Sequence, residues 1–313
     1  MPVHSLSRHF TAFFGNINPG SSYVSTASSE HSNARRLLED ISGPASELEV
    51  VTFLQGSYKQ DTAIHSINDI DIVALCSTLS QPGSGSGTAR IWLRDQIFAT
   101  LQAALVEDHR YRNKIRFNST SLCIKLDLEI KVEILPAVKK AGMADTDGEP
   151  FRIYRPEVAT WTDAYARYHQ GWLTDKNSRA NNFKPMIKVM KHLRDVYQNF
   201  IKTDAVSFHI ECLLYAVPDN AFDGSAADYI PRVLRVLANF PSPMARNSNI
   251  KSPCGDKILF SESEWSETAY TRFHNWVKWW ADKAEQARDA YDENTAITAW
   301  QNLLGDWFPR TAS

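Results

Sequence analysis

A glycine–serine pair and two aspartates have the types and spacing suited to chemistry on phosphate groups. Gly56-Ser57 follows the apolar, β-branched run 49–54, and Asp69 and Asp71 flank an isoleucine after eleven intervening residues. Glycine lets the backbone approach a phosphate closely, and a serine hydroxyl can donate to it. Alternate side chains of a strand share a face, so the two carboxylates project together, about 6–7 Å apart. Such a pair can share metal ions about 3.5–4 Å apart, which predicts Mg²⁺-assisted phosphoryl transfer.

Each of these motifs taken alone is common and most often only solvated or salt-bridged. Their joint occurrence at this spacing, with an otherwise apolar aspartate strand, is much rarer and favours a site. A third carboxylate is expected on a neighbouring strand. Asp127, Glu129 and Glu133 all lie on the polar phase of the alternating segment 122–134, so periodicity does not choose among them. The alternative is that all three lie on a solvated sheet face.

The segments around the motifs predict an N-terminal lobe of mixed α/β structure. Its expected elements are a helix over 25–42 ended by Gly43-Pro44, strands over 49–54 and 70–75, a flexible loop over 80–87, and a helix over 89–107. From 115 to 138, apolar and polar residues alternate with period two, regularly from Leu122 onward. This pattern predicts two strands separated by a short break, and Pro136 is expected to end the second strand.

The remainder of the chain is predicted to be mostly helical. One apolar stripe at helical spacing comprises Phe183, Met186, Ile187, Met190, Leu193, Tyr197 and Phe200. A further helix carries Trp276, Trp280, Ala284, Ala287 and Tyr291. Its tryptophans, with Trp279, offer a stacking platform for nucleic acid, but their spacing beside alanines is more typical of a helix–helix core. We therefore expect an α/β lobe over 1–150, with an N-terminal helix that bridges both lobes, and a helical lobe over 151–313.

Composition excludes several other classes of protein. The chain has 313 residues and a formal net charge of −2, which argues against a strongly basic nucleic-acid binder. Neither a membrane-length apolar run nor a signal-peptide core is evident, and four cysteines without a CxxC pair favour reduced thiols. We expect a cytoplasmic protein without membrane contact. No zinc-ligand spacing, phosphate-binding P-loop or GxSxG nucleophile motif is present.

The motifs resemble those of a known enzyme family. Leu54-Gln55-Gly56-Ser57-Tyr58 followed by Asn68-Asp69-Ile70-Asp71-Ile72-Val73 is similar to the signature of DNA polymerase β-like nucleotidyltransferases. More narrowly, it resembles the bacterial cyclic oligonucleotide synthases of antiphage defence, the CD-NTases. This resemblance implies a two-lobed α+β fold, with a mixed-sheet catalytic lobe and a helical C-terminal lobe. In the family the third carboxylate lies three residues before a proline, so the segment 132–137 selects Glu133, where aspartate is more usual.

The resemblance also implies roles in the helical lobe. Segment 188–193 is similar to the family's helix whose final lysine, here Lys191, contacts substrate phosphates. The sequence pattern alone also allows a solvated helix face that carries Lys184, Lys188 and Lys191. Segment 206–211 resembles the one in which a serine, here Ser207, contacts the triphosphate and the next aromatic residue, Phe208, stacks on a base. Ser207 as a helix N-cap and Phe208 as a core residue are the alternatives. The closing segment 305–309 is assigned to packing.

The implied activity is the joining of nucleoside triphosphates into a cyclic di- or oligonucleotide second messenger, with release of pyrophosphate. Asp69, Asp71 and Glu133 would be catalytic and hold two Mg²⁺ ions, for which Mn²⁺ can substitute. The nucleotide-binding set would be Gln55, Gly56, Ser57, Lys191, Ser207 and Phe208. The implied partners are a separate effector protein that binds the product, and regulatory proteins; no nucleic-acid activator is evident. The alternatives are a transferase that modifies RNA or a partner protein, as in toxin–antitoxin systems, and an inactive nucleotide-sensing module.

Overall fold

A computed structural model describes most of the chain. The described residues are 4–65, 69–81, 87–142, 150–198, 205–240, 252–253, 255, 259 and 264–311. Asn68, Phe200, Cys254 and residues 82–86 of the expected flexible loop therefore lie outside the described residues. Two compact units are formed: a sheet unit of residues 20–61 and 66–170, and a helical unit of residues 1–19, 62–65 and 171–313.

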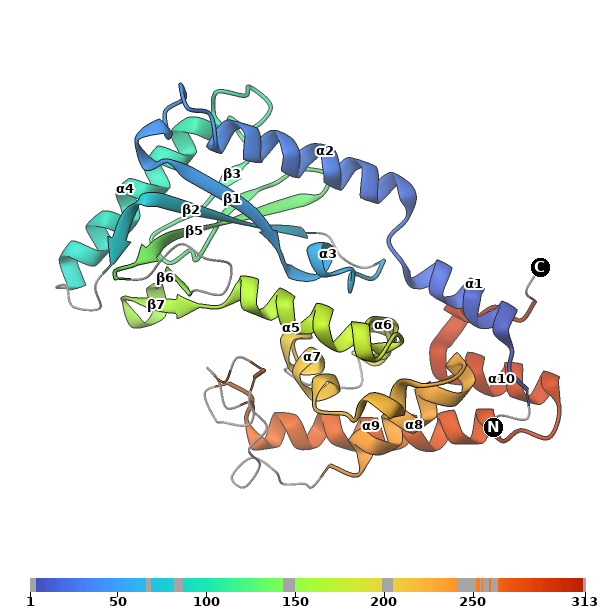
Figure 1. Ribbon diagram of the computed structural model, residues 1–313. Helices are drawn as coiled ribbons and strands as arrows, with labels where there is room; N and C mark the ends of the chain where they lie inside the picture. Colours follow the sequence, from blue (N-terminus) through green and yellow to red (C-terminus); the bar gives the residue numbers. More distant parts are fainter. Residues whose placement is uncertain are drawn as a thin grey trace. The chain divides into compact units, whose positions relative to one another are not determined.

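The sheet unit is built on one mixed seven-stranded sheet (Figure 1). Its strands are β1 (Val50–Gln55), β2 (Asp69–Gln81), β3 (Ile115–Arg116), β4 (Ile124–Leu126), β5 (Lys131–Lys140), β6 (Phe151–Arg155) and β7 (Thr160–Ala164). The order is β1-β2-β5-β4-β3, with β6 pairing with β5 and β7. Only β2 and β5 are paired in parallel, and every other pair among the described strands is antiparallel. The expected mixed sheet is confirmed.

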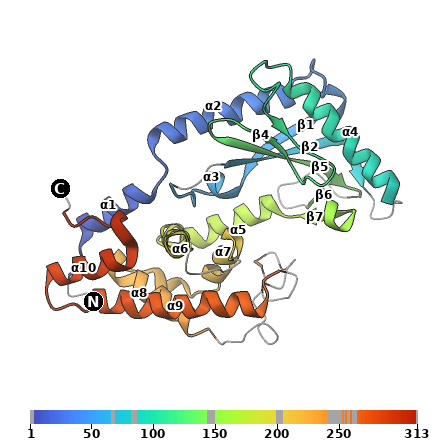
Figure 2. The same cartoon turned by 180° about the vertical axis from the view of Figure 1, so that it is seen from behind.

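Two helices cover one face of this sheet, α2 (Ser21–Leu38) and α4 (Gly87–Leu105) (Figure 2). Their apolar side chains form one core with alternate residues of the strands, among them Ile70 and Ile72 of β2. The other face carries a smaller apolar cluster that includes Val73. Because side chains alternate along β2, Asp69 and Asp71 lie on the same face as Val73, opposite the two helices.

Helix α2 ends four residues before the expected end at 42. Glu39, its C-cap, accepts hydrogen bonds from the Thr52 backbone N–H at 2.8 Å and hydroxyl at 2.6 Å. Asp40 accepts from the Ser42 backbone N–H at 2.9 Å. These side chains satisfy strand and turn donors rather than continuing a helix, so the chain turns before Gly43. Between β1 and β2 lies the short helix α3 (Gly56–Gln60).

The expected end of the alternating run at Pro136 is wrong. Strand β5 continues through this proline to Lys140, and Pro136 pairs with Ala74 of β2. On the other side, β4 pairs only up to Ile134 and β6 begins at Ala137. Neither β4 nor β6 pairs with residue 136. A proline, which has no N–H to donate, is therefore tolerated at this position of β5. The two strands expected from 115 to 138 are three, and Leu122 is exposed outside them.

The helical unit contains six helices of at least nine described residues within its own boundaries. They are α1 (Ser7–Ile17), α6 (Phe183–Tyr197), α7 (Ser207–Tyr215), α8 (Ala226–Ala238), α9 (Glu267–Arg288) and α10 (Glu293–Leu304). A seventh, α5 (Ala166–Arg179), crosses the unit boundary after Gln170. The 3₁₀ turns are η1 (Ser46–Leu48), η2 (Pro156–Val158), η3 (Asp219–Phe222) and η4 (Gly305–Trp307).

The apolar stripe predicted on α6 is confirmed within the described residues. From Phe183 to Leu193 its members are fully buried in the helical core, and the helix ends at Tyr197. Trp280 is also fully buried and Trp276 packs partly against the same core, as expected for helix–helix packing of α9. Trp279 is 37% exposed, unlike the expectation. Tyr291 lies beyond the end of that helix and is 85% exposed, unlike the expectation.

Two further strands, β6 and β7, follow the expected lobe boundary near residue 150 in the sequence. Strands β6 and β7 continue the sheet through their pairing with β5, and the sheet unit extends to Gln170. The Cys76, Cys123 and Cys212 side chains are buried. Within the described residues, every helix falls short of the length and apolar character that crossing a bilayer requires.

Candidate active site

Three carboxylates lie together where β2 and β5 run side by side. In the parallel register, Asp71 is directly opposite Glu133, and Asp69 is opposite Lys131. Ile70 and Ile72 are fully buried on the other face of the sheet, as expected from the alternation. The sheet register thus brings Glu133, rather than a more distant acidic residue, beside the aspartate pair.

Burial and mutual repulsion make this acidic group unfavourable in its fully charged form. Burial is the main cause that raises the pKa of Asp71 to about 7, and the charges of Asp69 and Glu133 raise it further. The pKa of Asp69 is also raised, first by burial and then by Glu133. A cation placed among these oxygens would offset both effects.

Gly56 packs directly over Asp71. Gln55 is the cross-strand partner of Asp71, so the turn that follows β1 begins beside that carboxylate. Gly56 has φ +71°, and a Cβ built there would lie 1.9 Å from Asp71 Oδ2. Any side chain there would displace the Asp71 carboxylate, so the contact as well as the backbone conformation favours glycine. Ser57 is half-buried in the first turn of α3.

Lys125 of β4 forms an ion pair with one member of this group. It is the cross-strand partner of Glu133, and its Nζ lies 2.6 Å from Glu133 Oε1. The Cys123 thiol donates to Glu133 Oε2 at 3.5 Å. The other two candidates for the third carboxylate stand apart: Asp127 pairs with Arg116 at 3.3 Å, and Glu129 is exposed outside the strands.

The donor chemistry of these residues fits a hard divalent cation. Carboxylate oxygens on one sheet face, beside a turn that favours glycine, are ligands that Mg²⁺ accepts together with substrate phosphates. Across the described residues, no three His, Cys, Asp or Glu side chains converge closely enough to hold a metal ion as they stand. In this arrangement the Lys125 ammonium is paired with Glu133. Asp69, Asp71 and Glu133 can therefore bind a metal ion together only if Glu133 exchanges this ion pair for the metal.

This competition gives a testable expectation for Lys125→Met. Removing the ammonium leaves Glu133 without its ion-pair partner and takes a positive charge away from Asp69 and Asp71, so the metal-free protein should melt at a lower temperature. The rise in melting temperature produced by Mg²⁺ should then be larger than in the wild type. Thermal scans with and without Mg²⁺ check this, with Lys278→Met, an exposed lysine on α9, as the control. An equal Mg²⁺ effect in Lys125→Met and wild type would contradict the competition.

The sequence patterns did not single out Lys125, nor a second neighbour, Tyr23. Burial, then the charges of Asp69 and Tyr58, raises the pKa of Tyr23 to about 12. Its hydroxyl is buried without a hydrogen-bond partner among the described residues. Tyr23 lies near the start of α2, and only the tertiary fold brings it near Asp69. Lys125 could be found only from the register of β4 with β5, which makes it the cross-strand partner of Glu133.

The residues expected to bind nucleotide from the helical unit have varied surroundings. Lys191 is 1% exposed, and its Nζ lies 2.8 Å from Glu211 Oε1. This differs from the solvated lysine face that the pattern alone also allowed. The contact of Lys191 with substrate phosphates stays a prediction. Ser207 is not the N-cap of α7, because Val206 occupies that position. Arg194 donates a hydrogen bond to the Ser207 hydroxyl at 3.4 Å. Phe208 is half-buried against the helical core.

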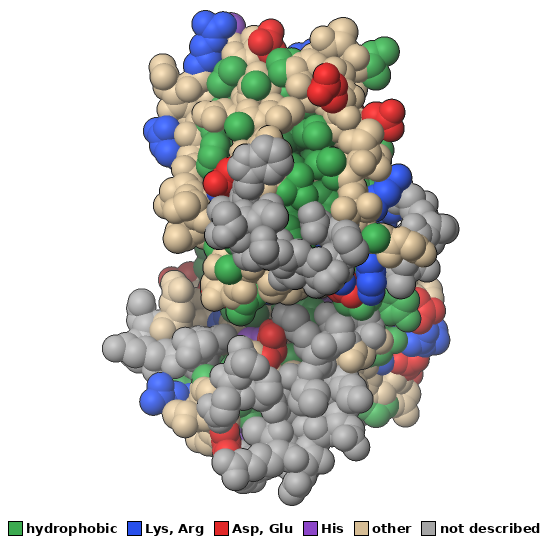
Figure 3. Space-filling model, turned by 90° about the vertical axis from the view of Figure 1, so that its left-hand side faces the viewer, with side chains coloured by type: hydrophobic (Ala, Val, Ile, Leu, Met, Phe, Trp, Pro, Cys, Tyr) green, Lys and Arg blue, Asp and Glu red, His purple; other side chains and the backbone are tan. Residues whose placement is uncertain are grey.

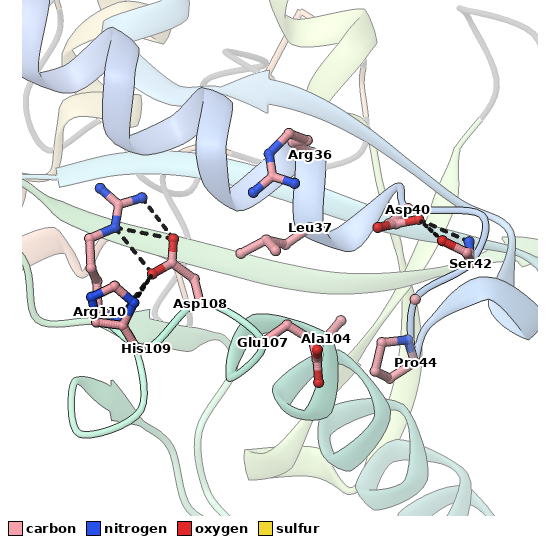
Figure 4. A pocket seen from close by; sticks show the side chains of 11 residues that line it. Arg36, Leu37, Asp40, Ser42, Pro44, Ala104, Glu107, Asp108, His109 and Arg110 are labelled. Carbon is pink, nitrogen blue, oxygen red and sulfur yellow. Dashed lines mark hydrogen bonds and ion pairs between the residues drawn. The ribbon is translucent and has the colours of Figure 1, made fainter.

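A separate pocket of about 790 Å³ opens on the sheet unit between the ends of α2 and α4 (Figure 4). Its charged groups largely pair with neighbours: Arg110 with Asp108 at 2.8 Å, and Asp40 with the Ser42 hydroxyl at 2.8 Å. It lies on the helix-covered face, opposite the carboxylates. On the face drawn in Figure 3, acidic and basic side chains of the described residues are interspersed.

Family models account for both parts of this architecture. The model of the second messenger oligonucleotide or dinucleotide synthetase domain matches residues 4–177, more than half of the chain. The cGAS/DncV-like nucleotidyltransferase C-terminal helical domain matches residues 172–281. The chain belongs to the CD-NTase family. The polymerase β-like fold class expected from the motifs is thereby confirmed, and this CD-NTase is a nucleotidyltransferase of the cyclic-oligonucleotide-synthase type.

Relatives of this CD-NTase are similar over most of their length. The cyclic UMP-AMP synthase of Rhodothermus marinus is 27% identical over 268 residues, 80% of this chain and 90% of the relative. The cyclic AMP-AMP-AMP synthase of an Acinetobacter species is 24% identical, covering 99% of this chain and 88% of the relative. The structure of a CdnC:HORMA-deltaN complex from E. coli MS115-1 matches with a TM-score of 0.72 and 14% identity, over 96% of this chain and 98% of that one.

Proposed function

We propose that this CD-NTase joins nucleoside triphosphates into a cyclic di- or oligonucleotide at Asp69, Asp71 and Glu133, with Mg²⁺ and with release of pyrophosphate. The observation that carries the assignment is the packing of Gly56 over Asp71, with Glu133 directly opposite on the parallel strand. Burial and two neighbouring carboxylates disfavour the charged form of Asp71; a bound cation offsets that cost, and an inactive sensing module has no use for such an arrangement.

The protein's part in the reaction is to position the reactants and stabilise their charge. A ribose 2′- or 3′-hydroxyl of one nucleotide attacks the α-phosphate of another; the P–O bond to pyrophosphate breaks, and the hydroxyl proton passes to solvent. A second such step within the linear product closes the ring. When bound, Mg²⁺ lowers the pKa of the attacking hydroxyl and offsets charge on the leaving pyrophosphate; Mn²⁺ is the expected substitute. Positioning of the hydroxyl in line with the leaving group, together with electrostatic stabilisation, would supply the remaining acceleration.

Further residues bind the nucleotides in this proposal. Gly56 gives phosphate oxygens access to the backbone, while Gln55 and Ser57 contact the nucleotide from the same turn. Ser207 contributes a hydroxyl to the triphosphate, and Phe208 stacks on a base, a contact favourable by about 1–3 kcal/mol. Support comes from their positions: Ser207 in the first turn of α7 and Phe208 only half-buried.

We also propose that the product is a second messenger in antiphage signalling and binds a separate effector protein. Family membership supports this proposal, because the domain that matches residues 4–177 is described as a second messenger oligonucleotide or dinucleotide synthetase. Regulation by a partner protein is a related proposal, favoured by the HORMA-deltaN complex of the E. coli neighbour.

A product assay tests the activity. The purified protein is incubated with Mg²⁺ and four labelled ribonucleoside triphosphates, treated with phosphatase, and the surviving species are identified by mass spectrometry. We expect a phosphatase-resistant product with the mass of a cyclic di- or oligonucleotide, and pyrophosphate in proportion. Label transferred instead to added RNA or to a partner protein, with no cyclic species, would overturn the proposal in favour of a modifying transferase.

A further inference from the structure

Two tryptophans of α9 lie beside, rather than on, the face that this helix buries. The buried stripe runs through Val277, Trp280 and Ala284 at helical spacing. Trp276 is only partly buried against the helical core, and Trp279 is 37% exposed. Core packing therefore accounts for Trp280, whereas the ring of Trp279 is largely left over for another use.

The two outer tryptophans and Tyr197 of α6 form the aromatic walls of a pocket of about 430 Å³ in the helical unit. The Tyr197 and Trp276 rings have centroids 5.4 Å apart and planes 32° apart. The Trp279 ring stands at 75° to Tyr197 and at 77° to Trp276, with centroids 5.4 and 5.5 Å away. Asn275, which is exposed, also lines the pocket. A space of this size and apolar character suits a small molecule.

The walls of this pocket are held in place from behind. The Tyr197 hydroxyl donates to the carbonyl oxygens of Asn302 and Leu303, at 3.2 and 3.1 Å. The Tyr197 and Trp276 rings both pack against the helical core, where Trp280 lies 6.1 and 6.5 Å from them between centroids. A site whose walls are already fixed loses little side-chain entropy when a ligand binds.

The charge beside the pocket selects the class of ligand. Lys283 follows Trp279 by one helical turn, and its Nζ lies 5.9 Å from the centroid of that ring. Among the described residues that line the pocket, none is acidic. A cationic ligand would therefore meet a like charge at the ring face, without an acid to compensate it, whereas an anionic group would be attracted.

The polar group of the pocket narrows the class further. The Asn275 amide offers both hydrogen-bond donors and an acceptor, as the edge of a nucleobase does. Aromatic side chains stack on any base, because every base has a flat π-face. A flat ring, a polar edge and a negative charge occur together in a nucleoside phosphate.

We propose that this pocket is a second binding site for one nucleoside phosphate, in which the base stacks on Trp279, its edge pairs with Asn275 and the phosphate pairs with Lys283. The site shares no residue with the carboxylates of the sheet unit or with Ser207 and Phe208 of α7. A nucleotide held there is a ligand of the helical unit and not a reactant. The inference stands independently of the proposed function.

The experiment reads binding at the pocket itself by ¹⁹F nuclear magnetic resonance of the full chain labelled with 5-fluorotryptophan. The signals of Trp276 and Trp279 are assigned from Trp276→Phe and Trp279→Phe. The metal-free protein is titrated with AMP, with adenosine, which lacks the phosphate, and with ribose 5-phosphate, which lacks the base. Because the signals are local and AMP has no pyrophosphate to release, neither binding at the carboxylates nor turnover is mistaken for binding at the pocket.

AMP should shift both signals in a saturable way, adenosine should bind more weakly, and ribose 5-phosphate should leave them unchanged. Trp279→Ala, followed through the Trp276 signal, should bind AMP at least about fivefold more weakly, and Trp279→Tyr should restore most of the affinity. Lys283→Met should weaken AMP roughly fivefold and leave adenosine unchanged. Tyr291→Ala removes an aromatic side chain that is 85% exposed outside the pocket, so it should bind AMP like the wild type.

Several results would overturn the proposal. One is the absence of a saturable shift with AMP and adenosine; another is a shift with choline, an oligoproline peptide or an oligoribonucleotide when AMP gives none, which would assign the pocket to that class instead. Equal affinity for AMP in Lys283→Met and wild type would remove the phosphate from the assignment. The signal of the buried Trp280 checks folding, and if Trp279→Ala does not fold, the Lys283→Met comparison still decides.

Titration with ATP and with the purified cyclic product distinguishes the two nucleotides that the proposed function would supply. Preference for either over ribose 5-phosphate supports the site. If the protein makes no cyclic product, the proposed function fails, while the AMP titration is unaffected and still decides whether the pocket binds a nucleotide.

Discussion

Asp71→Asn should abolish cyclic product formation without unfolding the protein. Asp71 lies beside Gly56 and opposite Glu133, where its charge is the one best placed to hold a cation. Loss of a ligand that supplies several kcal/mol of transition-state stabilisation predicts a fall in kcat of at least about 1,000-fold. The melting temperature in metal-free buffer should stay equal or rise, because the substitution removes a buried charge that two other carboxylates repel.

A matched control separates this effect from a general loss of charge on the sheet. Asp127→Asn removes an exposed carboxylate that pairs with Arg116, and it should leave the rate within about twofold of wild type. Product formation is measured by mass spectrometry and folding by circular dichroism. Full activity in Asp71→Asn would contradict the assignment of the metal site.

Gly56→Ala should reduce activity nearly as strongly, although it adds only one methyl group. The new Cβ would lie 1.9 Å from Asp71 Oδ2 and 3.0 Å from Asp71 Cγ, so the carboxylate must rotate away from its position. Misplacement of a reacting group by about 1 Å predicts a loss of roughly 100-fold in kcat. The φ of +71° adds about 1–2 kcal/mol of backbone strain, measurable as a lower free energy of unfolding.

Gly142→Ala isolates the backbone strain from the contact. Gly142 has φ +81°, but a Cβ there would have no atom of the described residues within 4 Å. This variant should lose a similar amount of stability and keep its activity. If Gly56→Ala and Gly142→Ala were equally active at equal loss of stability, the contact with Asp71 would have no catalytic meaning.

The aspartate pair is predictable from the sequence because the relevant physics is local. Period-two alternation in β2 is enough to place Asp69 and Asp71 on one face and Ile70 on the other. The third carboxylate is less accessible, since alternation treats Asp127, Glu129 and Glu133 alike. The resemblance points to Glu133, and the β2–β5 register places it opposite Asp71.

Features that depend on distant segments are not predictable in this way. Lys191 looks like a surface lysine from its helical spacing, but Glu211 and the Thr62 carbonyl oxygen make a buried partner set for it. Strand β5 continues past Pro136 because β4 and β6, on the side away from β2, leave a gap at that residue. In both cases the deciding atoms come from other parts of the chain, about which a local pattern contains no information.

The most direct test of the central claim is the stoichiometry of Mn²⁺ binding in the presence of a non-hydrolysable nucleoside triphosphate. Electron paramagnetic resonance titration counts bound ions without requiring turnover. If Asp69, Asp71 and Glu133 hold the catalytic metals, the wild type should bind two ions per chain and Asp71→Asn should lose at least one of them, with Asp127→Asn unchanged. Equal Mn²⁺ binding by wild type and Asp71→Asn would contradict the account.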